Sequence, residues 1–247
     1  MSLNRRLSAA LKQRAKSKNF RRDFDSFQRL ALRNGRSFDL NWNERLPCLD
    51  DGTKQTPFDR HYIYHTAWAA RMLAQTRPAE HVDIGSALYF ATLVSAFVPV
   101  RFYDYRPAPI YLTGLSSDRA DLLALPFVDN SIFSLSCMHV VEHIGLGRYG
   151  DPLDPEGDLK AISELTRVLA KGGSLLFVVP VGRPRIQFNA HRIYSSAQVV
   201  KAFESLRLSE WALIPDNASD GGVVANPPLK MIDAQSYGCG CFCFNKA

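Results

Sequence analysis

The chain has 247 residues, of which 46% are hydrophobic and 22% are charged, and these values are typical of one soluble α/β domain with some length to spare. The net charge of +6 is concentrated at the start, because residues 1–36 carry eleven Lys and Arg against two Asp, which leaves the remainder slightly acidic at −3. The longest apolar run, residues 87–100, is too short and too often interrupted to span a membrane, and no apolar segment typical of a signal peptide follows the basic start.

The first 57 residues are predicted to form a basic arm and a loop-rich connector, ahead of a single domain over residues 58–247. Leu3, Leu7 and Leu11 recur every four residues among basic side chains, which predicts a short amphipathic helix. Such a helix would either pack its leucines on the domain or a partner subunit, or contact an anionic membrane surface, an acidic glycan or RNA.

Predicted strands and helices alternate from residue 58 onward, and the strands are short and almost uniformly apolar, as buried parallel strands are. The predicted order is helix 58–73, strand 81–85, helix 87–97, strand 100–104, strand 132–137, helix 158–173, strand 174–180, a helix from Ser195 or Ser196 to Leu206, and strands 208–214 and 237–244. Asp158 is the predicted cap of its helix, and Gly172 and Gly173 are its predicted left-handed stop. This alternation predicts a doubly wound three-layer α/β fold with a mostly parallel sheet.

The chain contains five cysteines, an odd number, and shows no sign of secretion, so we expect reduced thiols and a cytoplasmic protein. Cys239, Cys241 and Cys243 alternate, which would place all three on one face of a strand. Their spacing is not the C-x-x-C of zinc sites. A buried strand with small apolar thiols is therefore the interpretation we favour, with metal binding as the alternative.

Small and acidic residues stand at the ends of the first two predicted strands. Asp83, Gly85 and Ser86 end the first strand, and Asp104 ends the second, twenty-one residues after Asp83. In a doubly wound sheet, ligands bind beyond the carboxyl ends of the strands, and a carboxylate at this spacing suits the ribose hydroxyls of a nucleotide. A dinucleotide fingerprint would need its third glycine at Phe90, so we do not expect NAD.

The motifs "VDIGS", "YDYRP", "ADLLALPFVDNSIFSLSCMHVVEHI" and "LTRVLAKGGSLLFVVP" resemble, in this order, those of class I S-adenosylmethionine-dependent methyltransferases of the methyltransferase-11-like group. The chain looks most similar to an uncharacterised branch that carries "VVEHIGLGRYGDP" and "FNAHRIYS" and is typical of surface-polysaccharide gene neighbourhoods. The resemblance implies a Rossmann-like fold with an antiparallel last strand, and S-adenosylmethionine as cofactor. It implies a cofactor set of Asp83, Gly85 and Ser86 at the methionine moiety, Asp104 at the ribose, Asp121 and Leu122 beside the adenine, and Met138.

The segment from His139 to His143 reads "HVVEH", which matches the H-x-x-E-H spacing of zinc peptidases. In a peptidase this motif lies on a helix, so that both histidines share one face. Here it follows a predicted strand and precedes "GLGRYGDP", which places it in the loop or first turn at the carboxyl edge of the sheet. We therefore interpret it as the acceptor side of the site and not as a peptidase motif.

Three hypotheses remain open for His139, Glu142, His143 and His191. The four side chains orient loops through hydrogen bonds, or His143 or His191, with Glu142, provides the base that deprotonates a hydroxyl acceptor. In the third hypothesis all four bind a divalent metal that lowers the pKa of the acceptor, and histidine ligands favour zinc, manganese or iron over magnesium.

Two further side chains near this motif are candidate substrate contacts. Tyr149 lies in the turn "GRYGDP", for which a plain structural role is the alternative. Arg192 follows the strand 174–180, where it would clamp a carboxylate or phosphate of the substrate.

The resulting hypothesis is a methyltransferase acting on a hydroxyl of a saccharide, a glycan intermediate or another small molecule, with the acceptor class taken from the resemblance alone. One alternative is a methyltransferase-like binding module without catalysis, suggested by the thinned glycine loop at Gly85. The other is an RNA methyltransferase that uses the basic arm, although nucleic acid is not the partner we expect.

Overall fold

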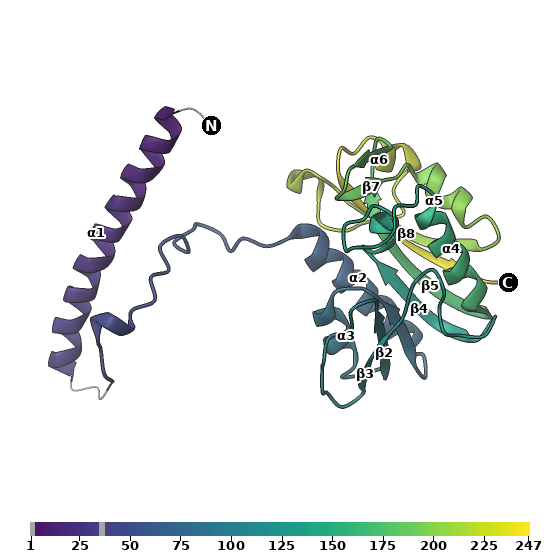
Figure 1. The fold of residues 1–247 in the computed structure, drawn as a ribbon, viewed down its shortest axis with the longest axis horizontal. Helices are drawn as coiled ribbons and strands as arrows, with labels where there is room; N and C mark the ends of the chain where they lie inside the picture. The colour runs from purple at the N-terminus through teal and green to yellow at the C-terminus, as the bar shows by residue number, and fades with distance from the viewer. Residues whose placement is uncertain (1–2, 35–37) are drawn as a thin grey trace. The chain divides into compact units, whose positions relative to one another are not determined.

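The computed structural model describes residues 3–34 and 38–247, and it divides the chain into two compact units (Figure 1). The first unit ends at Phe58, and the second spans Asp59–Ala247. Within the described residues, no helix combines the length and apolar character needed to cross a membrane.

The first unit consists of one long helix, α1 (Leu3–Asn34), and a connector that contains the 3₁₀ helix η1 (Trp42–Glu44). The predicted helix continues well beyond the leucine repeat because no Pro or Gly occurs before residue 35. Trp42 packs against the rings of Phe20 and Phe24 and lies under the guanidinium of Arg21, so the connector folds onto the helix.

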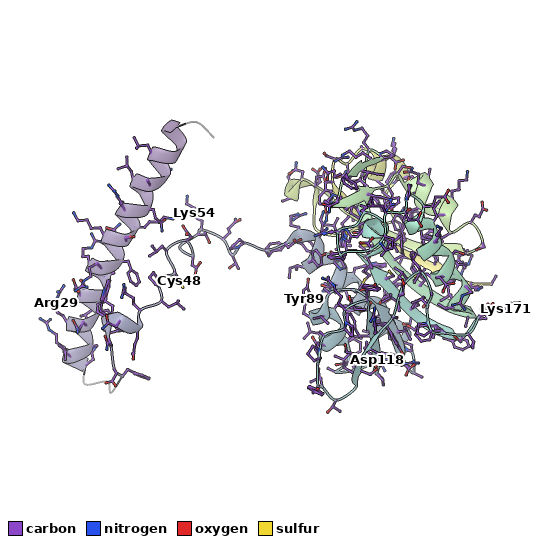
Figure 2. The ribbon with its side chains drawn as sticks, viewed as in Figure 1. Arg29, Cys48, Lys54, Tyr89, Asp118 and Lys171 are labelled. Carbon is purple, nitrogen blue, oxygen red and sulfur yellow. The ribbon has the colours of Figure 1, made fainter. Side chains whose placement is uncertain are left out.

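The described leucines of the repeat in α1 do not pack within this unit. Leu7 and Leu11 are 67% and 60% exposed, and the side chain of Leu3 lies outside the described residues. Cys48, in the connector, is also exposed (Figure 2).

An eight-stranded sheet in the order β3-β2-β1-β4-β5-β10-β8-β9 forms the centre of the second unit. The pairs β3-β2, β2-β1, β1-β4 and β4-β5 are parallel, and β10 is antiparallel to both β5 and β8. The strands are β1 (His81–Ile84), β2 (Val100–Asp104), β3 (Leu115–Arg119), β4 (Ile132–Met138), β5 (Leu169–Val181), β8 (Arg207–Ile214), β9 (Val224–Ala225) and β10 (Gly238–Asn245). The predicted doubly wound α/β fold with an antiparallel last strand is confirmed.

Helices cover both faces of this sheet, which makes three layers (Figure 1). One face packs against α2 (Arg60–Thr76) and α3 (Leu88–Val94), and the other against α4 (Gly157–Val168), α5 (Ser196–Ala202) and α6 (Leu229–Asp233). A separate hairpin of β6 (Arg185–Gln187) and β7 (His191–Ile193) follows β5. The edge strand β3 was not predicted, because its sequence "LSSDR" is polar and it pairs with β2 alone.

Both predicted ends of α4 were wrong. Glu156 and not Asp158 occupies the cap position of α4, and the helix ends at Val168, before the predicted glycine stop. Gly172 does adopt a left-handed φ of 74°, but inside β5. The predicted start of α5 is confirmed, since Ser195 caps it in a capping box with Gln198.

The three alternating cysteines of β10, Cys239, Cys241 and Cys243, are buried on the sheet face that α2 and α3 cover. This confirms the predicted strand with buried thiols. The Sγ atom of Cys239 also lies 3.4 Å from Nε2 of His139.

Candidate functional site

Two adjoining cavities open at the carboxyl ends of β1, β2 and β4, where the chain order of the sheet reverses. The strand-end cavity, of about 240 Å³, is lined by residues that follow the strands, including Asp104, Asp121 and Leu122. The histidine cavity, of about 640 Å³, is lined by His61, His139, His143 and His191 among others. Both cavities share four lining residues, Gly85, His139, His143 and Tyr149.

Gly85 forms the turn between the two cavities. Its φ of 67° is left-handed, and a Cβ on it would lie 3.2 Å from both methyl groups of Val140, so only glycine fits without displacement. The next residue, Ser86, is buried, and its Oγ accepts a hydrogen bond from the backbone N–H of Met138 at 3.1 Å. This bond ties the loop after β1 to the end of β4. Ser86 and Met138 both line the histidine cavity.

Asp104 presents a carboxylate in the strand-end cavity. Its Oδ1 accepts the backbone N–H of Arg106 at 2.7 Å, which fixes the side chain at the end of β2. The structure therefore brings Asp104, Asp121 and Leu122 together in one cavity, as the sequence analysis predicts.

Asp83 lines neither cavity. It is fully buried, and Ser136 Oγ donates a hydrogen bond to its Oδ1, while its Oδ2 has no partner among the described residues. Burial raises the pKa of this carboxyl from 3.8 to about 7, against the hydrogen bond from Ser136, which lowers it. The position of Asp83 does not support the predicted direct ligand contact, because the side chain is fully buried and bonds Ser136.

A buried polar network continues from Asp83 along the sheet. The ring of His81 bridges Ser136 Oγ at 2.9 Å and Ser134 Oγ at 2.8 Å. Ser134 and Ser136 thus both pair with one buried histidine. Burial lowers the pKa of His81 to about 3, so the pair carries no charge.

The H-x-x-E-H segment begins at the end of β4 and enters a short 3₁₀ helix, η2 (Val141–His143). His139 has a left-handed φ of 57°, which is uncommon for a non-glycine residue and separates it from the helical residues after it. The two histidines therefore do not share the face of one α-helix, as a zinc peptidase requires.

Glu142 is buried between the two histidines of this segment. Its Oε1 lies 2.8 Å from His139 Nδ1 and 3.8 Å from His143 Nε2, and its Oε2 has no partner among the described residues. Burial raises the pKa of Glu142 to about 7, although the nearby His143 lowers it. The carboxyl of Glu142 is therefore partly protonated near pH 7.

His143 has one ring nitrogen held and one free. Its Nδ1 lies 2.6 Å from the carbonyl oxygen of Ala190, which assigns the proton to Nδ1 and leaves Nε2 as an acceptor. Burial lowers the pKa of His143, so the ring is neutral at pH 7. His191 Nε2 lies 2.7 Å from Gln187 Oε1, and its ring centroid is 6.3 Å from that of His143. Both histidines line the same cavity.

The remaining wall of the histidine cavity is aromatic and cationic. Tyr149 lines both cavities, as expected for a substrate contact, and Tyr62 and Tyr237 face the histidine cavity. Arg148 Nη1 lies 3.0 Å from the carbonyl oxygen of Ala190, next to His143. These side chains come from three separate segments, namely α2, the loop after η2 and the segment before β10.

Arg192, the other predicted substrate contact, is buried away from both cavities. Its guanidinium donates to the carbonyl oxygens of Ile144, Asp154 and Pro155 and lies 3.5 Å from Asp158. The prediction of a substrate clamp at Arg192 is therefore wrong. The side chain holds the loop after η2 in place, because a buried guanidinium needs all of its donors satisfied.

The predicted metal set of His139, Glu142, His143 and His191 does not assemble as a metal site. Among residues 3–34 and 38–247, the group of possible ligand atoms that lies within 4.8 Å is His61, His139 and Cys239.

Sequence reasoning missed several residues of the histidine cavity, namely Asp59, Arg60, His61, Arg148 and Tyr237. One available signal was the spacing of His61 and His65, four residues apart on one face of α2 after the Asp59 cap. Arg148 and Tyr237 gave no local signal, because they reach the cavity only through the tertiary fold.

Comparison with known proteins identifies the fold. A family model described as "Caenorhabditis protein of unknown function, DUF268" matches residues 127–210, and no curated protein matches. The N-methyltransferase NodS from Bradyrhizobium japonicum WM9, solved with S-adenosyl-L-homocysteine, is 16% identical with a TM-score of 0.52, over 80% of this chain and 92% of that one.

The fold is the Rossmann-like fold of S-adenosylmethionine-dependent methyltransferases. The 1,6-didemethyltoxoflavin-N1-methyltransferase from Burkholderia thailandensis, solved with S-adenosylhomocysteine, shares it at 10% identity and a TM-score of 0.52, over 74% of this chain and 79% of that one. A methyltransferase solved with the Trm112 activator of Haloferax volcanii is 19% identical with a TM-score of 0.50, over 76% of this chain and 90% of that one. At these identities the likeness concerns the fold.

The residues of the two cavities fit an adenosyl ligand. Gly85 makes a left-handed turn without a side chain between the two cavities, and Asp104 offers carboxylate oxygens to ribose hydroxyls in the strand-end cavity. Leu122 supplies an apolar wall beside Asp121 for a flat base. The site needs no pyrophosphate-binding loop for such a ligand.

Proposed function

We propose that the protein transfers a methyl group from S-adenosylmethionine to a hydroxyl of a saccharide, a glycan intermediate or another small molecule. The observation that carries the proposal is the junction of the two cavities. A carboxylate suited to ribose, Asp104, lies in one, and a neutral histidine with a free nitrogen, His143, lines both. Cofactor and acceptor would therefore meet at Gly85 and His143.

S-adenosylmethionine, when bound, supplies an electrophilic methyl group on a sulfonium sulfur. The chain's own residues then hold the acceptor in line with that methyl group and remove the hydroxyl proton as the new O–C bond forms. His143 Nε2 takes this proton, and the carbonyl of Ala190 keeps the ring in the required tautomer. The carboxyl of Glu142, 3.8 Å from Nε2, stabilises the resulting imidazolium.

The walls of the histidine cavity support a polyhydroxylated acceptor. Tyr62, Tyr149 and Tyr237 offer flat faces with polar tips, and Arg60 and Arg148 offer several donors. This combination suits a ring with many hydroxyls, or a sugar that carries a carboxylate or phosphate. The acceptor class rests on this wall and on the sequence resemblance.

Calorimetric titration of the full chain with S-adenosylhomocysteine tests the cofactor site. We expect binding to the unaltered protein and about 10- to 100-fold weaker binding to Asp104→Ala, since a hydrogen bond to a charged group contributes about 1.5–3 kcal/mol. Asp118→Ala is the matched control, because this exposed aspartate lies on the neighbouring strand β3 and lines neither cavity (Figure 2).

Absence of binding at millimolar ligand would overturn the proposal and favour a methyltransferase-like binding module. Equal weakening by both aspartate variants would show that the ribose assignment is wrong.

A further inference from the structure

We propose that His61, His139 and Cys239 bind one divalent zinc-class metal ion in the inner wall of the histidine cavity. The three side chains come from distant parts of the chain: the first turn of α2, the end of β4 and the start of β10. Their ligand atoms lie within 4.8 Å of one another.

His139 is already arranged as a metal ligand. Its Nδ1 lies 2.8 Å from the buried carboxyl of Glu142, which leaves Nε2 directed at Cys239 Sγ, 3.4 Å away. A carboxylate on the far nitrogen is the usual partner of a metal-bound histidine, because it fixes the ring and strengthens the ligand. The left-handed backbone at His139 sets this direction, and its N–H is held by Val178 at 2.8 Å.

The separations suit a tetrahedral ion. With Zn–S near 2.3 Å and Zn–N near 2.05 Å, the edge between sulfur and nitrogen is about 3.6 Å. The gap of 3.4 Å between His139 and Cys239 matches this edge. His61 is the adjustable ligand, because it lies in the first turn of α2 at the cavity rim and is only partly buried.

Unsatisfied polar atoms surround the three ligands. His65 is fully buried, its ring centroid lies 4.9 Å from that of His139, and its Nε2 has no partner among the described residues. The Oε2 atom of Glu142 is likewise unpartnered. Buried polar atoms without partners are costly, so two of them beside a His-His-Cys group indicate a polar occupant that the protein chain does not supply.

The donor set selects the metal and the site type. One thiolate and two imidazoles favour zinc, or cobalt as its probe, over magnesium and calcium. His61 and His139 line the histidine cavity and Cys239 does not, so the fourth position of the ion faces the cavity. Three protein ligands with one open position are typical of catalytic and not of structural zinc sites. The metal site itself does not depend on the proposed methyl transfer. Only the binding of an acceptor hydroxyl at the open position depends on it.

The test uses the full chain, stripped of metal with a chelator and titrated with Co²⁺ and then with Zn²⁺. We expect one equivalent of each, a thiolate-to-cobalt charge-transfer band, and displacement of cobalt by zinc. Cys239→Ser should remove the band, and Cys241→Ser should keep it. Cys241 is the matched control, because it is equally buried on the same face of β10.

His61→Ala provides a second variant at the rim, where loss of a side chain does not disturb the core. We expect its zinc affinity to fall at least as far as the about 10- to 100-fold loss typical of a changed second-shell partner. Binding of S-adenosylhomocysteine should persist in both variants, which separates failure of this proposal from failure of the methyltransferase proposal.

The proposal is overturned if the stripped protein binds no stoichiometric cobalt. It is also overturned if cobalt binding survives in both Cys239→Ser and His61→Ala but is lost in His143→Gln, since the metal would then belong to the other histidines.

Discussion

The two cavities that meet at Gly85 are built in different ways. The strand-end residues assigned to the cofactor stand at or just after the ends of β-strands, as Asp104 ends β2, so the hydrogen-bonded sheet fixes their positions. The histidine cavity instead draws on α2, η2, the β6-β7 hairpin and the segment before β10. Sheet edges are rigid and loops are adaptable, so the first cavity suits binding of an invariant cofactor and the second suits a particular acceptor.

This division predicts that binding and turnover respond to different substitutions. A substitution in the histidine cavity should lower the rate of methyl transfer without changing cofactor affinity. A substitution beneath the strand ends should change the free energy of unfolding.

The largest effect is expected for His143→Gln. Loss of a positioned general base lowers kcat by about 100- to 10,000-fold, whereas S-adenosylhomocysteine affinity should stay within about twofold. Transfer of labelled methyl from S-adenosylmethionine to a panel of free sugars and sugar nucleotides measures the first quantity, and calorimetry measures the second. A variant that retains wild-type turnover would exclude His143 as the base.

The next effect is a pH dependence of stability caused by Asp83. Its pKa is about 7 in the folded protein against 3.8 normally, so the folded state holds this proton more tightly than the unfolded chain. The contribution of Asp83 to the free energy of unfolding is therefore greatest below about pH 4, falls as the pH rises toward 7, and is constant above it, with a total change of up to about 4 kcal/mol. Asp83→Asn should lack this decrease.

Denaturant unfolding between pH 4.5 and 8 measures this difference. Glu142 titrates in both proteins, and Asp104, which helps to raise the pKa of Asp83, is present in both, so the difference between the two curves isolates Asp83. Asp118→Asn, on the exposed edge strand, should give a curve parallel to the wild type. Parallel curves for Asp83→Asn as well would show that the buried carboxyl is not protonated.

The same division explains what the sequence could predict. Strand ends carry a local signal, since Gly85 follows one apolar run and Asp104 ends the next, and both residues line the strand-end cavity. The fold followed from the alternation of those runs, apart from the polar edge strand β3 and the short elements β6, β7, β9 and α6. The His61, His139 and Cys239 cluster had no such signal, because its members lie on three elements that only the tertiary fold brings together.

Arg192 shows a second limit of sequence reasoning. An arginine near the rim of a sheet has the chemistry needed to clamp a substrate. The sequence does not show whether its side chain faces a cavity or a loop. Here the carbonyls of residues 144, 154 and 155 occupy its donors. Arg148 lines the histidine cavity, where the prediction had placed Arg192.

Gly85 belongs to both cavities and gives the smallest and most specific effect. Gly85→Ala places a methyl group 3.2 Å from Val140 in a left-handed conformation, which should cost about 1–2 kcal/mol of stability and weaken S-adenosylhomocysteine about tenfold. Gly172→Ala has the same backbone penalty at a φ of 74° but no atom within 4 Å of the new Cβ, so it should lose stability and keep its affinity. Unfolding measurements on the two variants report the backbone strain, and calorimetry reports whether the new methyl group also weakens ligand binding. If both bind equally well, the loop after β1 does not touch the cofactor, and the two cavities function independently of each other.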